Sequence, residues 1–174
     1  RRWKALLRYY KGGKLLDVGC LDSLVPALAR RKDSKATIWG LDQAPEAMKV
    51  MAAKYPDIHF IVESVYSLPF GDRDFDYVVM GELIEHLERP GDVFREAMRI
   101  LKPGGILALS TPFNEAIEIG AIDENHHLWS FTKEDILNLL SPYGKIKIKT
   151  LRSRYFPRYQ YAFPTIIAWC WKNA

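Results

Sequence analysis

Apolar residues along this chain fall into two kinds of segment, short continuous runs and stretches with helical spacing. Continuous runs predict buried strands, and they occur at residues 14–19, 36–41, 58–62, 75–80, 106–110, 145–151 and 165–171. Apolar positions three and four residues apart predict amphipathic helices, which we place at residues 1–10, 24–31, 45–55, 93–101 and 133–140. Strands and helices therefore alternate along most of the chain.

This alternation predicts an α/β fold. Strand–helix–strand units form right-handed crossovers and a parallel sheet with helices on both faces. The runs at 75–80 and 106–110 are apolar almost throughout, as expected for strands covered on both faces. No helix separates the last two strands, which we expect to pair antiparallel. The sequence thus predicts one Rossmann-like domain, residues 1–174, with a doubly wound, mostly parallel, seven-stranded sheet and an antiparallel C-terminal edge pair.

The composition is that of an ordinary globular protein, with 48% hydrophobic and 26% charged residues. Cys20 and Cys170 lie far apart, which argues against a disulfide framework and fits a reducing compartment. No apolar run reaches the length of a membrane span, since the best one, 162–171, is short and contains Pro164. No secretory signal is visible. We therefore expect a cytoplasmic protein with no membrane span; its oligomeric state stays open.

The positive net charge of +4 is concentrated at the C-terminal end. From Tyr143 onward the chain has seven Lys and Arg and no Asp or Glu, so the rest of the chain is slightly acidic. Such a segment could meet nucleic acid, an acidic membrane surface or an anionic substrate. However, Lys145, Lys147 and Lys149 alternate with apolar residues, which favours a solvent-facing edge strand instead.

Ligands of an open α/β sheet bind beyond the carboxyl ends of its strands. The residues that follow these ends are therefore the candidates for binding and catalysis. In chain order they are Asp17, Gly19, Cys20, Asp42, Gln43, Glu63, Ser64, Val65, Gly81, Glu82, Glu85, His86 and Thr111.

Three carboxylates in this set suit three parts of one ligand. Asp42 is placed to accept hydrogen bonds from two ribose hydroxyls. Glu63 follows the third strand, where a carboxylate can accept from an adenine amino group. Asp17, in the turn after the first strand, could pair with an ammonium group. A ligand with a ribose, an adenine and a cationic end therefore fits this edge.

A dinucleotide fits less well, because its pyrophosphate needs exposed backbone N–H groups from several glycines. The stretch "LDVGCLDS" supplies only Gly19, with Leu21 and Ser23 at the following positions, and the charge of Asp22 would repel phosphate. A nicotinamide-dependent oxidoreductase is therefore disfavoured.

Six motifs in order carry a family resemblance: "LLDVGC", "WGLDQAPEAM", "ESVYSLPFGDRDFDYVV", "GELIEHL", "LKPGGILALSTP" and "HHLWSFTKEDILNLL". Together they resemble the class I S-adenosylmethionine-dependent methyltransferases, of the methyltransferase type 11–12 group that includes the ubiquinone-biosynthesis O-methyltransferases. The resemblance runs from about Lys14 to Tyr143 and through the last two strands. It implies S-adenosylmethionine as cofactor and S-adenosylhomocysteine as product.

The resemblance also implies roles for the strand-end residues. Residues of about 12–112 would bind the cofactor, and about 113–174 would form the acceptor loop and the closing strands. The implied cofactor-binding residues are Asp17, Gly19, Cys20, Asp42, Gln43, Glu63, Ser64, Val65, Gly81 and Glu82. The family has further glycines at positions 21 and 23, so Leu21 and Ser23 either reshape the floor of the pocket or weaken binding. Because the carboxylates remain, we favour an intact pocket.

Methyl transfer to a hydroxyl group benefits from a general base that removes its proton. His86 lies just after the fourth strand, and His127 lies in the long segment after the fifth, in "HLWSFT". We therefore assign His86 and His127 as candidate catalytic residues. A structural role for His86, as a hydrogen-bonding residue at a helix start, is nearly as well supported.

A divalent metal is a further hypothesis for this region. Glu82, Glu85 and His86 have the spacing i, i+3 and i+4, which gathers side chains on one helical face. With His127 they resemble the metal site of the small-RNA 3′-terminal 2′-O-methyltransferases. The sequence does not favour this reading, because "EHL" is common after this strand in family members without a metal. We therefore expect no metal ligands.

We expect methyl transfer to a small-molecule acceptor, at oxygen. Two alternatives stay open: metal-assisted RNA 2′-O-methylation, with nucleic acid as partner, and a catalytically inactive methyltransferase-like binding or scaffold domain. The aromatic and basic segment 152–163, "RSRYFPRYQYAF", could stack on bases or form a packed hairpin or a dimer contact. The sequence does not decide between these.

Overall fold

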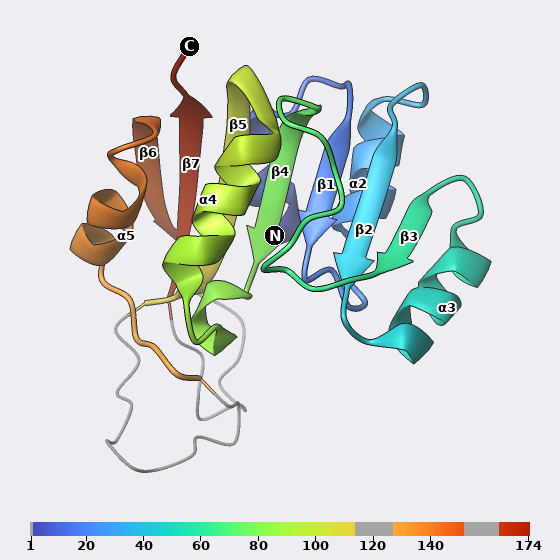
Figure 1. Cartoon of the computed structure of the whole chain (residues 1–174), viewed down its shortest axis with the longest axis horizontal. Helices are drawn as coiled ribbons and strands as arrows, with labels where there is room; N and C mark the ends of the chain where they lie inside the picture. The colour runs from blue at the N-terminus through green and yellow to red at the C-terminus, as the bar shows by residue number, and fades with distance from the viewer. Residues whose placement is uncertain (1, 114–126, 152–163) are drawn as a thin grey trace.

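A computed structural model describes residues 2–113, 127–151 and 164–174. Its centre is one seven-stranded sheet in the order β3-β2-β1-β4-β5-β7-β6 (Figure 1). The strands are β1 (Leu15–Val18), β2 (Ile38–Asp42), β3 (His59–Val62), β4 (Phe75–Gly81), β5 (Leu101–Pro112), β6 (Gly144–Leu151) and β7 (Thr165–Lys172). The predicted α/β, Rossmann-like fold is thus confirmed.

The strand order reverses between β1 and β4. Along the chain, β1, β2 and β3 build outward on one side, and β4 and β5 build outward on the other, all parallel. A gap opens in such a sheet where successive crossovers leave in opposite directions, and ligands bind there. The carboxyl ends of β1 and β4 therefore frame the candidate site.

The last two strands pair antiparallel, as predicted, but only one of them runs against the sheet. β7 lies between β5 and β6 and is antiparallel to both, so β6 at the edge points the same way as β5. In β6 the residues Lys145, Lys147 and Lys149 are exposed and their neighbours are half-buried. The predicted lysine-bearing edge strand is thus confirmed.

Helices cover both faces of the sheet. They are α1 (Arg2–Leu6), α2 (Val25–Lys32), α3 (Pro45–Lys54), α4 (Pro90–Ile100) and α5 (Lys133–Leu140), with short 3-10 turns η1 (Leu7–Tyr9) and η2 (Ile84–His86). Helices α4 and α5 share one apolar core with the front of the sheet, and α1 and α2 share another behind it (Figure 1). None of the described helices is long and apolar enough to cross a bilayer.

Local sequence signals explain two of the helix starts. α4 begins three residues before the predicted start because Pro90 occupies its first turn, where a missing N–H costs no hydrogen bond. α5 begins where predicted. The Thr132 side chain accepts a hydrogen bond from the Asp135 N–H, and the Asp135 carboxylate accepts one from the Thr132 N–H. This reciprocal pair is a capping box.

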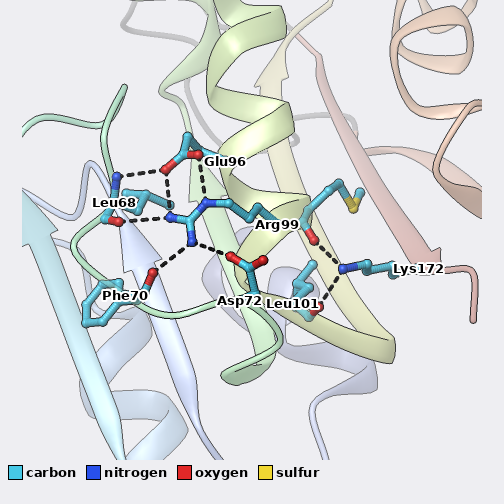
Figure 2. A network of polar contacts seen from close by, with 8 residues as sticks. Leu68, Phe70, Asp72, Glu96, Arg99, Leu101 and Lys172 are labelled. Carbon is cyan, nitrogen blue, oxygen red and sulfur yellow. Dashed lines mark hydrogen bonds and ion pairs between the residues drawn. The ribbon is translucent and has the colours of Figure 1, made fainter.

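Arg99 of α4 fixes the loop that continues from the end of β3 (Figure 2). Its guanidinium donates to the carbonyl oxygens of Leu68 and Phe70 at 3.0 and 2.8 Å and to Asp72 at 2.9 Å. Glu96 accepts two further bonds from Arg99 and one from the Leu68 N–H. Because a planar guanidinium holds several acceptors in one geometry, the loop beside the candidate site is attached firmly to α4.

Lys172 attaches the end of β7 to the end of the same helix. Its ammonium group donates to the carbonyl oxygens of Met98 at 2.6 Å and Leu101 at 2.7 Å (Figure 2). The last carbonyls of a helix have no partner within the helix, so this cation stabilises the α4 terminus. The reversed strand β7 is thereby held against the parallel part of the sheet.

Candidate active site

The register of the parallel strands brings the predicted site residues to one edge of the sheet. Val18 of β1 pairs with Leu41 of β2 and with Met80 of β4. The residues just beyond these three positions are Gly19, Asp42 and Gly81, which therefore surround the point where the strand order reverses. Register alone thus places the backbone at the ends of the first, second and fourth strands around one space.

The turn after β1 depends on Gly19. Its backbone has φ +66°, which is the left-handed region, and a Cβ here would lie 2.7 Å from the Leu83 side chain. The N–H groups of Gly19 and Cys20 both donate to the carbonyl of Leu41, at 2.8 and 3.0 Å. The chain therefore turns sharply back over β2 instead of continuing as a strand.

Leu21 also adopts a left-handed backbone, with φ +35°. This conformation is costly for a residue with a branched side chain. A hydrogen bond from the Leu21 N–H to Asp42 Oδ2 at 2.9 Å holds it there. The side chain is 51% exposed, so it lies at the rim of the turn and does not fill the space beneath it. We therefore expect that Leu21 reshapes the pocket and does not block it.

Replacing Leu21 by Gly is expected to stabilise the chain by about 0.5–1 kcal/mol, because glycine adopts the left-handed region at no steric cost. Affinity for S-adenosylhomocysteine, measured by calorimetry, should change by no more than about threefold. Leu21→Ala is the matched variant, since it removes the side chain but keeps the strained backbone. A tenfold gain in affinity for both variants would instead mean that Leu21 blocks the pocket.

Ser23 is buried and organises the start of α2. Its hydroxyl oxygen accepts a hydrogen bond from the Val25 N–H at 3.0 Å, and its own N–H donates to the carbonyl of Cys20 at 2.5 Å. Its side chain also hydrogen-bonds Asp17. The serine side chain therefore stabilises the turn that leads into α2, whose N-cap is Leu24, and glycine has no side chain for this role.

Asp17 differs from its prediction, because it lies within β1 and not in the turn after it. Its carboxyl group is only 1% exposed, and its Oδ2 has no hydrogen-bond partner within the described residues. Burial raises the pKa of Asp17 to about 7; the hydrogen bond from Ser23 opposes this shift, and the charge of Asp42 adds to it. A buried carboxylate oxygen without a partner is costly, and a bound cation would satisfy it.

Asp42, at the end of β2, has a structural task besides any ligand. Its Oδ2 accepts from the Leu21 N–H at 2.9 Å, and its Oδ1 accepts from the Ala44 N–H at 3.0 Å. Each ionised carboxylate oxygen has two acceptor sites, so each can still accept from a hydroxyl group. Asp42 is half-buried and Gln43 is exposed at the same edge.

The segment after β3 lies at the surface. Glu63 and Ser64 are exposed, and Val65 is half-buried against the core. Glu63 Oε1 accepts the N–H of Ser64 at 2.9 Å, which turns the chain at the strand end. Because Glu63 N–H donates to the carbonyl of Asp42, the two predicted carboxylates occupy adjacent strand ends.

Only the main chain of Cys20 lies at the candidate site. Its side chain is buried, and its thiol donates to the Met48 sulfur at 3.7 Å. Burial raises the pKa of the Cys20 thiol well above its usual range, so it is not a reactive thiolate. The predicted contribution of Cys20 to cofactor binding is thus restricted to its main chain.

The end of β4 is covered by α1, an arrangement that the sequence did not indicate. Glu82 has a left-handed backbone, φ +53°, and its carboxylate pairs with Arg2 at 3.0 Å. The guanidinium of Arg2 stacks on the Trp3 ring. This ring packs so close to Gly81 that a Cβ at position 81 would lie only 2.6 Å from it. No sequence pattern links residues 2 and 82. From the sequence, Trp3 is predicted only to lie on the core-facing side of the first helix.

Glu85, His86 and His127 form a second group beside this edge. One ligand atom from each lies within 4.8 Å of the others, and the two imidazole rings are 4.8 Å apart between centroids. Glu85 is buried and accepts a hydrogen bond from the Thr111 hydroxyl at 3.1 Å. Burial, with the nearby charge of Glu82, raises the pKa of Glu85 to about 8.

Backbone hydrogen bonds hold the two histidine-bearing segments together. The N–H groups of Leu128 and Trp129 donate to the carbonyl of Glu85, at 2.7 and 3.3 Å. The Trp129 indole N–H donates to the carbonyl of Leu87 at 2.6 Å. His86 and His127 are thus neighbours, as the sequence hypothesis required. His126 and the segment 152–163 lie outside the described residues.

The fold and the carboxylate-lined turn define the class of the protein. A Rossmann-like sheet with the reversed strand β7, together with the buried Asp17 and the half-buried Asp42 at the strand ends, is the arrangement of a class I S-adenosylmethionine-dependent methyltransferase. Residues 16–109, more than half of the chain, match the family model described as a methyltransferase domain. The chain belongs to this family, whose cofactor is S-adenosylmethionine.

Curated relatives cover part of the chain. A ubiquinone biosynthesis O-methyltransferase of Paracidovorax citrulli is 34% identical over 115 residues, which is 63% of this chain and 48% of the relative. A demethylmenaquinone methyltransferase of Chlorobaculum tepidum is 33% identical over 100 residues, 57% of this chain and 40% of the relative. The chain thus spans less than half the length of either relative.

Solved structures show the same fold at low sequence identity. The YcgJ protein from Bacillus subtilis has a TM-score of 0.77 at 16% identity, covering 99% of this chain and 98% of that one. The [4+2]-cyclase SpnF has a TM-score of 0.81 at 20% identity, covering 99% and 81%. Since a cyclase shares the fold, the fold alone does not determine the reaction.

Proposed function

We propose that this chain transfers the methyl group of S-adenosylmethionine to a small-molecule acceptor, at an oxygen atom. The observation that carries the proposal is the buried Asp17 carboxyl, whose Oδ2 has no hydrogen-bond partner in the described part of the chain. An ammonium group would satisfy such a buried acid, because it supplies both a hydrogen bond and the opposite charge. The amino acid end of S-adenosylmethionine carries one.

The other strand-end residues would bind the rest of the cofactor. Asp42 has acceptor sites left for the ribose hydroxyls, and Glu63 on the neighbouring strand end suits an adenine amino group. Ser64 and Val65 would border the adenine, and the main chain of Gly19 and Cys20 would border the amino acid end. Gln43 would lie beside the ribose. Gly81 and Glu82 would form the wall next to the sulfonium.

When bound, S-adenosylmethionine supplies an already activated methyl group, so the chain contributes chiefly orientation. Transfer to a hydroxyl also requires that its proton be accepted. His86 and His127 are the candidates, because they lie together at the carboxyl end of β4. The name of one relative, a ubiquinone biosynthesis O-methyltransferase, supports an oxygen atom as the acceptor.

RNA 2′-O-methylation and a non-catalytic scaffold remain the competing hypotheses. An RNA acceptor would need a basic or aromatic binding surface, and the segment considered for this purpose, 152–163, lies outside the described residues. A scaffold would not bind the cofactor at all. Cofactor binding therefore separates the proposed enzyme from the scaffold, and acceptor trials separate the two enzymes.

Calorimetry with S-adenosylmethionine and S-adenosylhomocysteine tests the cofactor site. The intact chain should bind both with micromolar affinity. Asp42→Ala should weaken binding about 10- to 30-fold, because it removes a charged acceptor of the ribose hydroxyls and the anchor of the Leu21 N–H. Asp42→Asn keeps one acceptor oxygen, so its affinity for the cofactor should lie between those of wild type and Asp42→Ala.

Asp22→Ala is the control, since Asp22 is an exposed carboxylate in the same turn and its loss should leave binding within about twofold. If the intact chain binds neither compound, the proposal fails and the scaffold hypothesis is favoured. If Asp42→Ala and Asp22→Ala weaken binding equally, the effect is one of net charge, and the assignment of Asp42 to the ribose hydroxyls is wrong.

A further inference from the structure

We propose that a hollow at the amino ends of β4 and β5 binds a flat aromatic ring that carries a negative group. The hollow lies at the edge of the sheet opposite the candidate active site, where β7 ends because it runs the other way (Figure 1). Its volume of about 360 Å³ suits one ring system with a small substituent. The lining side chains that matter for binding are Tyr9, Tyr10, Lys11, Asp76, Tyr77 and Trp171.

Aromatic rings that are fixed in place form the wall of the hollow. Tyr9 and Trp171 are half-buried, with their ring centroids 5.0 Å apart at an interplanar angle of 62°. Tyr10 packs edge-on against Tyr77, with the centroids 5.4 Å apart, and its hydroxyl donates to the carbonyl of Gly13 at 3.0 Å. Since these side chains are already ordered, stacking a ligand ring on them costs little conformational entropy.

Lysines border this aromatic wall. Lys11 lines the hollow and is exposed. Lys145 of β6 is directly opposite Trp171 of β7, so the two side chains project from the same face of the sheet, with their Cβ atoms about 4.5–5.5 Å apart. The Lys147 ammonium group lies 5.6 Å from the centre of the Tyr9 ring, and its hydrogen bond lowers the pKa of the Tyr9 hydroxyl. A negative group attached to a bound ring would therefore be attracted here.

Asp76 is the one carboxylate among the described residues that line the hollow, and its charge is already compensated. Its Oδ1 accepts a hydrogen bond from the Lys102 ammonium group at 2.7 Å, and its Oδ2 accepts one from the Lys14 N–H at 2.8 Å. The neighbouring Asp74 pairs with the Lys14 ammonium group at 2.6 Å. Repulsion of an anion by these carboxylates is thus weak, and a cationic ligand would find no unpaired partner in Asp76.

A mononucleotide and an aromatic carboxylate both have the required chemistry. In each, the ring would stack at Tyr9 and Trp171, and the phosphate or carboxylate would lie near Lys11 and Lys145. S-adenosylmethionine is unsuited to this hollow, because its sulfonium and ammonium groups are positive. Since the hollow and the candidate active site lie at opposite edges of the sheet, both can be occupied at once.

Calorimetry with guanosine 5′-monophosphate and with 2-naphthoate, each with and without excess S-adenosylhomocysteine, tests the hollow. At least one of these probes should bind one-to-one with a dissociation constant of about 1 mM or lower, and S-adenosylhomocysteine should not change that constant. Inorganic phosphate should bind at least about tenfold more weakly, because it has no ring to stack.

Two pairs of lysine substitutions separate a local site from a general charge effect. Lys11→Gln with Lys145→Gln should weaken binding of the probe about tenfold. The matched control is Lys54→Gln with Lys149→Gln, which changes the net charge equally and should leave affinity within about twofold. Both control lysines are exposed, and Lys149 lies four residues beyond Lys145 on the same face of β6, about 13 Å away.

Trp171 tests the aromatic half of the site. Trp171→Leu should weaken binding about fivefold or more, and Trp171→Phe, which keeps a ring, should weaken it less. Circular dichroism checks that both variants are folded. The lysine pairs give an independent answer, since they alter only exposed side chains.

The ligand class follows from which probe binds. Binding of guanosine 5′-monophosphate alone would support a nucleotide, and binding of 2-naphthoate alone would support an aromatic carboxylate. Failure of both probes to bind, their displacement by S-adenosylhomocysteine, or phosphate binding of equal strength would overturn the proposal. Equal losses in the two lysine pairs would overturn it as well.

Discussion

Replacing Asp17 by Asn is expected to stabilise the cofactor-free chain, most strongly above about pH 7, and to weaken S-adenosylmethionine binding at least about 100-fold. The two effects have one cause. The Asp17 carboxyl is buried, and burial raises its pKa from 3.8 to about 7. Asparagine is neutral at every pH, so it removes the cost of a buried charge, but it also removes the partner of the ammonium group.

The pH dependence of this effect has a definite sign. A carboxyl whose pKa is raised on folding binds a proton in the folded chain, and its contribution to stability is present below the unfolded pKa of about 3.8 and is lost as pH rises through about 7. Asp17→Asn should therefore already be more stable than wild type by roughly 1–2 kcal/mol near pH 5, because the unfolded carboxyl is ionised there while the folded one is not. Near pH 8–9 the variant should be more stable by on the order of 2–4 kcal/mol.

Denaturant unfolding between pH 5 and 9, with calorimetry of S-adenosylhomocysteine, measures both effects. Some pH dependence should remain in Asp17→Asn, because the pKa of Glu85 is also raised, to about 8. Asp22→Asn is the control, since this exposed carboxylate should change neither quantity appreciably. If the free energies of unfolding of wild type and Asp17→Asn changed with pH in the same way, the assignment of a buried, protonated Asp17 would be contradicted.

Replacing Gly19 by Ala is expected to lower the free energy of unfolding by about 2–4 kcal/mol and to weaken S-adenosylhomocysteine binding about 100-fold. The left-handed backbone at φ +66° costs an alanine about 1–2 kcal/mol. The added Cβ would also lie 2.7–3.2 Å from three atoms of the Leu83 side chain, and relieving that contact costs more. A displacement of about 1 Å in this turn can cost about 100-fold in function.

Gly104→Ala separates the two causes. Gly104 has a similar backbone, φ +76°, but a Cβ there would meet nothing within 4 Å. This variant should lose only about 1–2 kcal/mol of stability, the strain of the backbone alone, and should bind S-adenosylhomocysteine as wild type does. If Gly19→Ala and Gly104→Ala were equally stable and bound equally well, then crowding by Leu83 would not matter.

The element order and the strand-end carboxylates could be predicted because both depend on local signals. Apolar periodicity reports which segments are buried, and a parallel sheet brings the carboxyl ends of its strands to one edge whatever the loops do. Asp42 and Glu63 thus followed from counting residues after each strand. Asp17 was assigned to the turn after the first strand although it lies inside the predicted run 14–19, and the structure places it within β1.

Conformations and contacts that depend on distant parts of the chain could not be predicted. The left-handed backbone of Leu21 requires a hydrogen bond to Asp42, and the pairing of Arg2 with Glu82 joins residues 80 positions apart. No periodicity encodes such contacts, because they arise only when separate elements pack on one sheet. The placement of β7 between β5 and β6 is of the same kind.

The sequence by itself determined the α/β class, the edge of the sheet that carries the site, and the carboxylates Asp17, Asp42 and Glu63 as candidate ligand groups. Only the tertiary structure decided that Asp17 and Glu85 are buried, each with an oxygen that has no partner in the described residues, and that His127 meets His86. The reason is physical: local pattern decides which element a side chain lies on and at which edge of the sheet, but its contacts and its removal from water depend on every element packed around it.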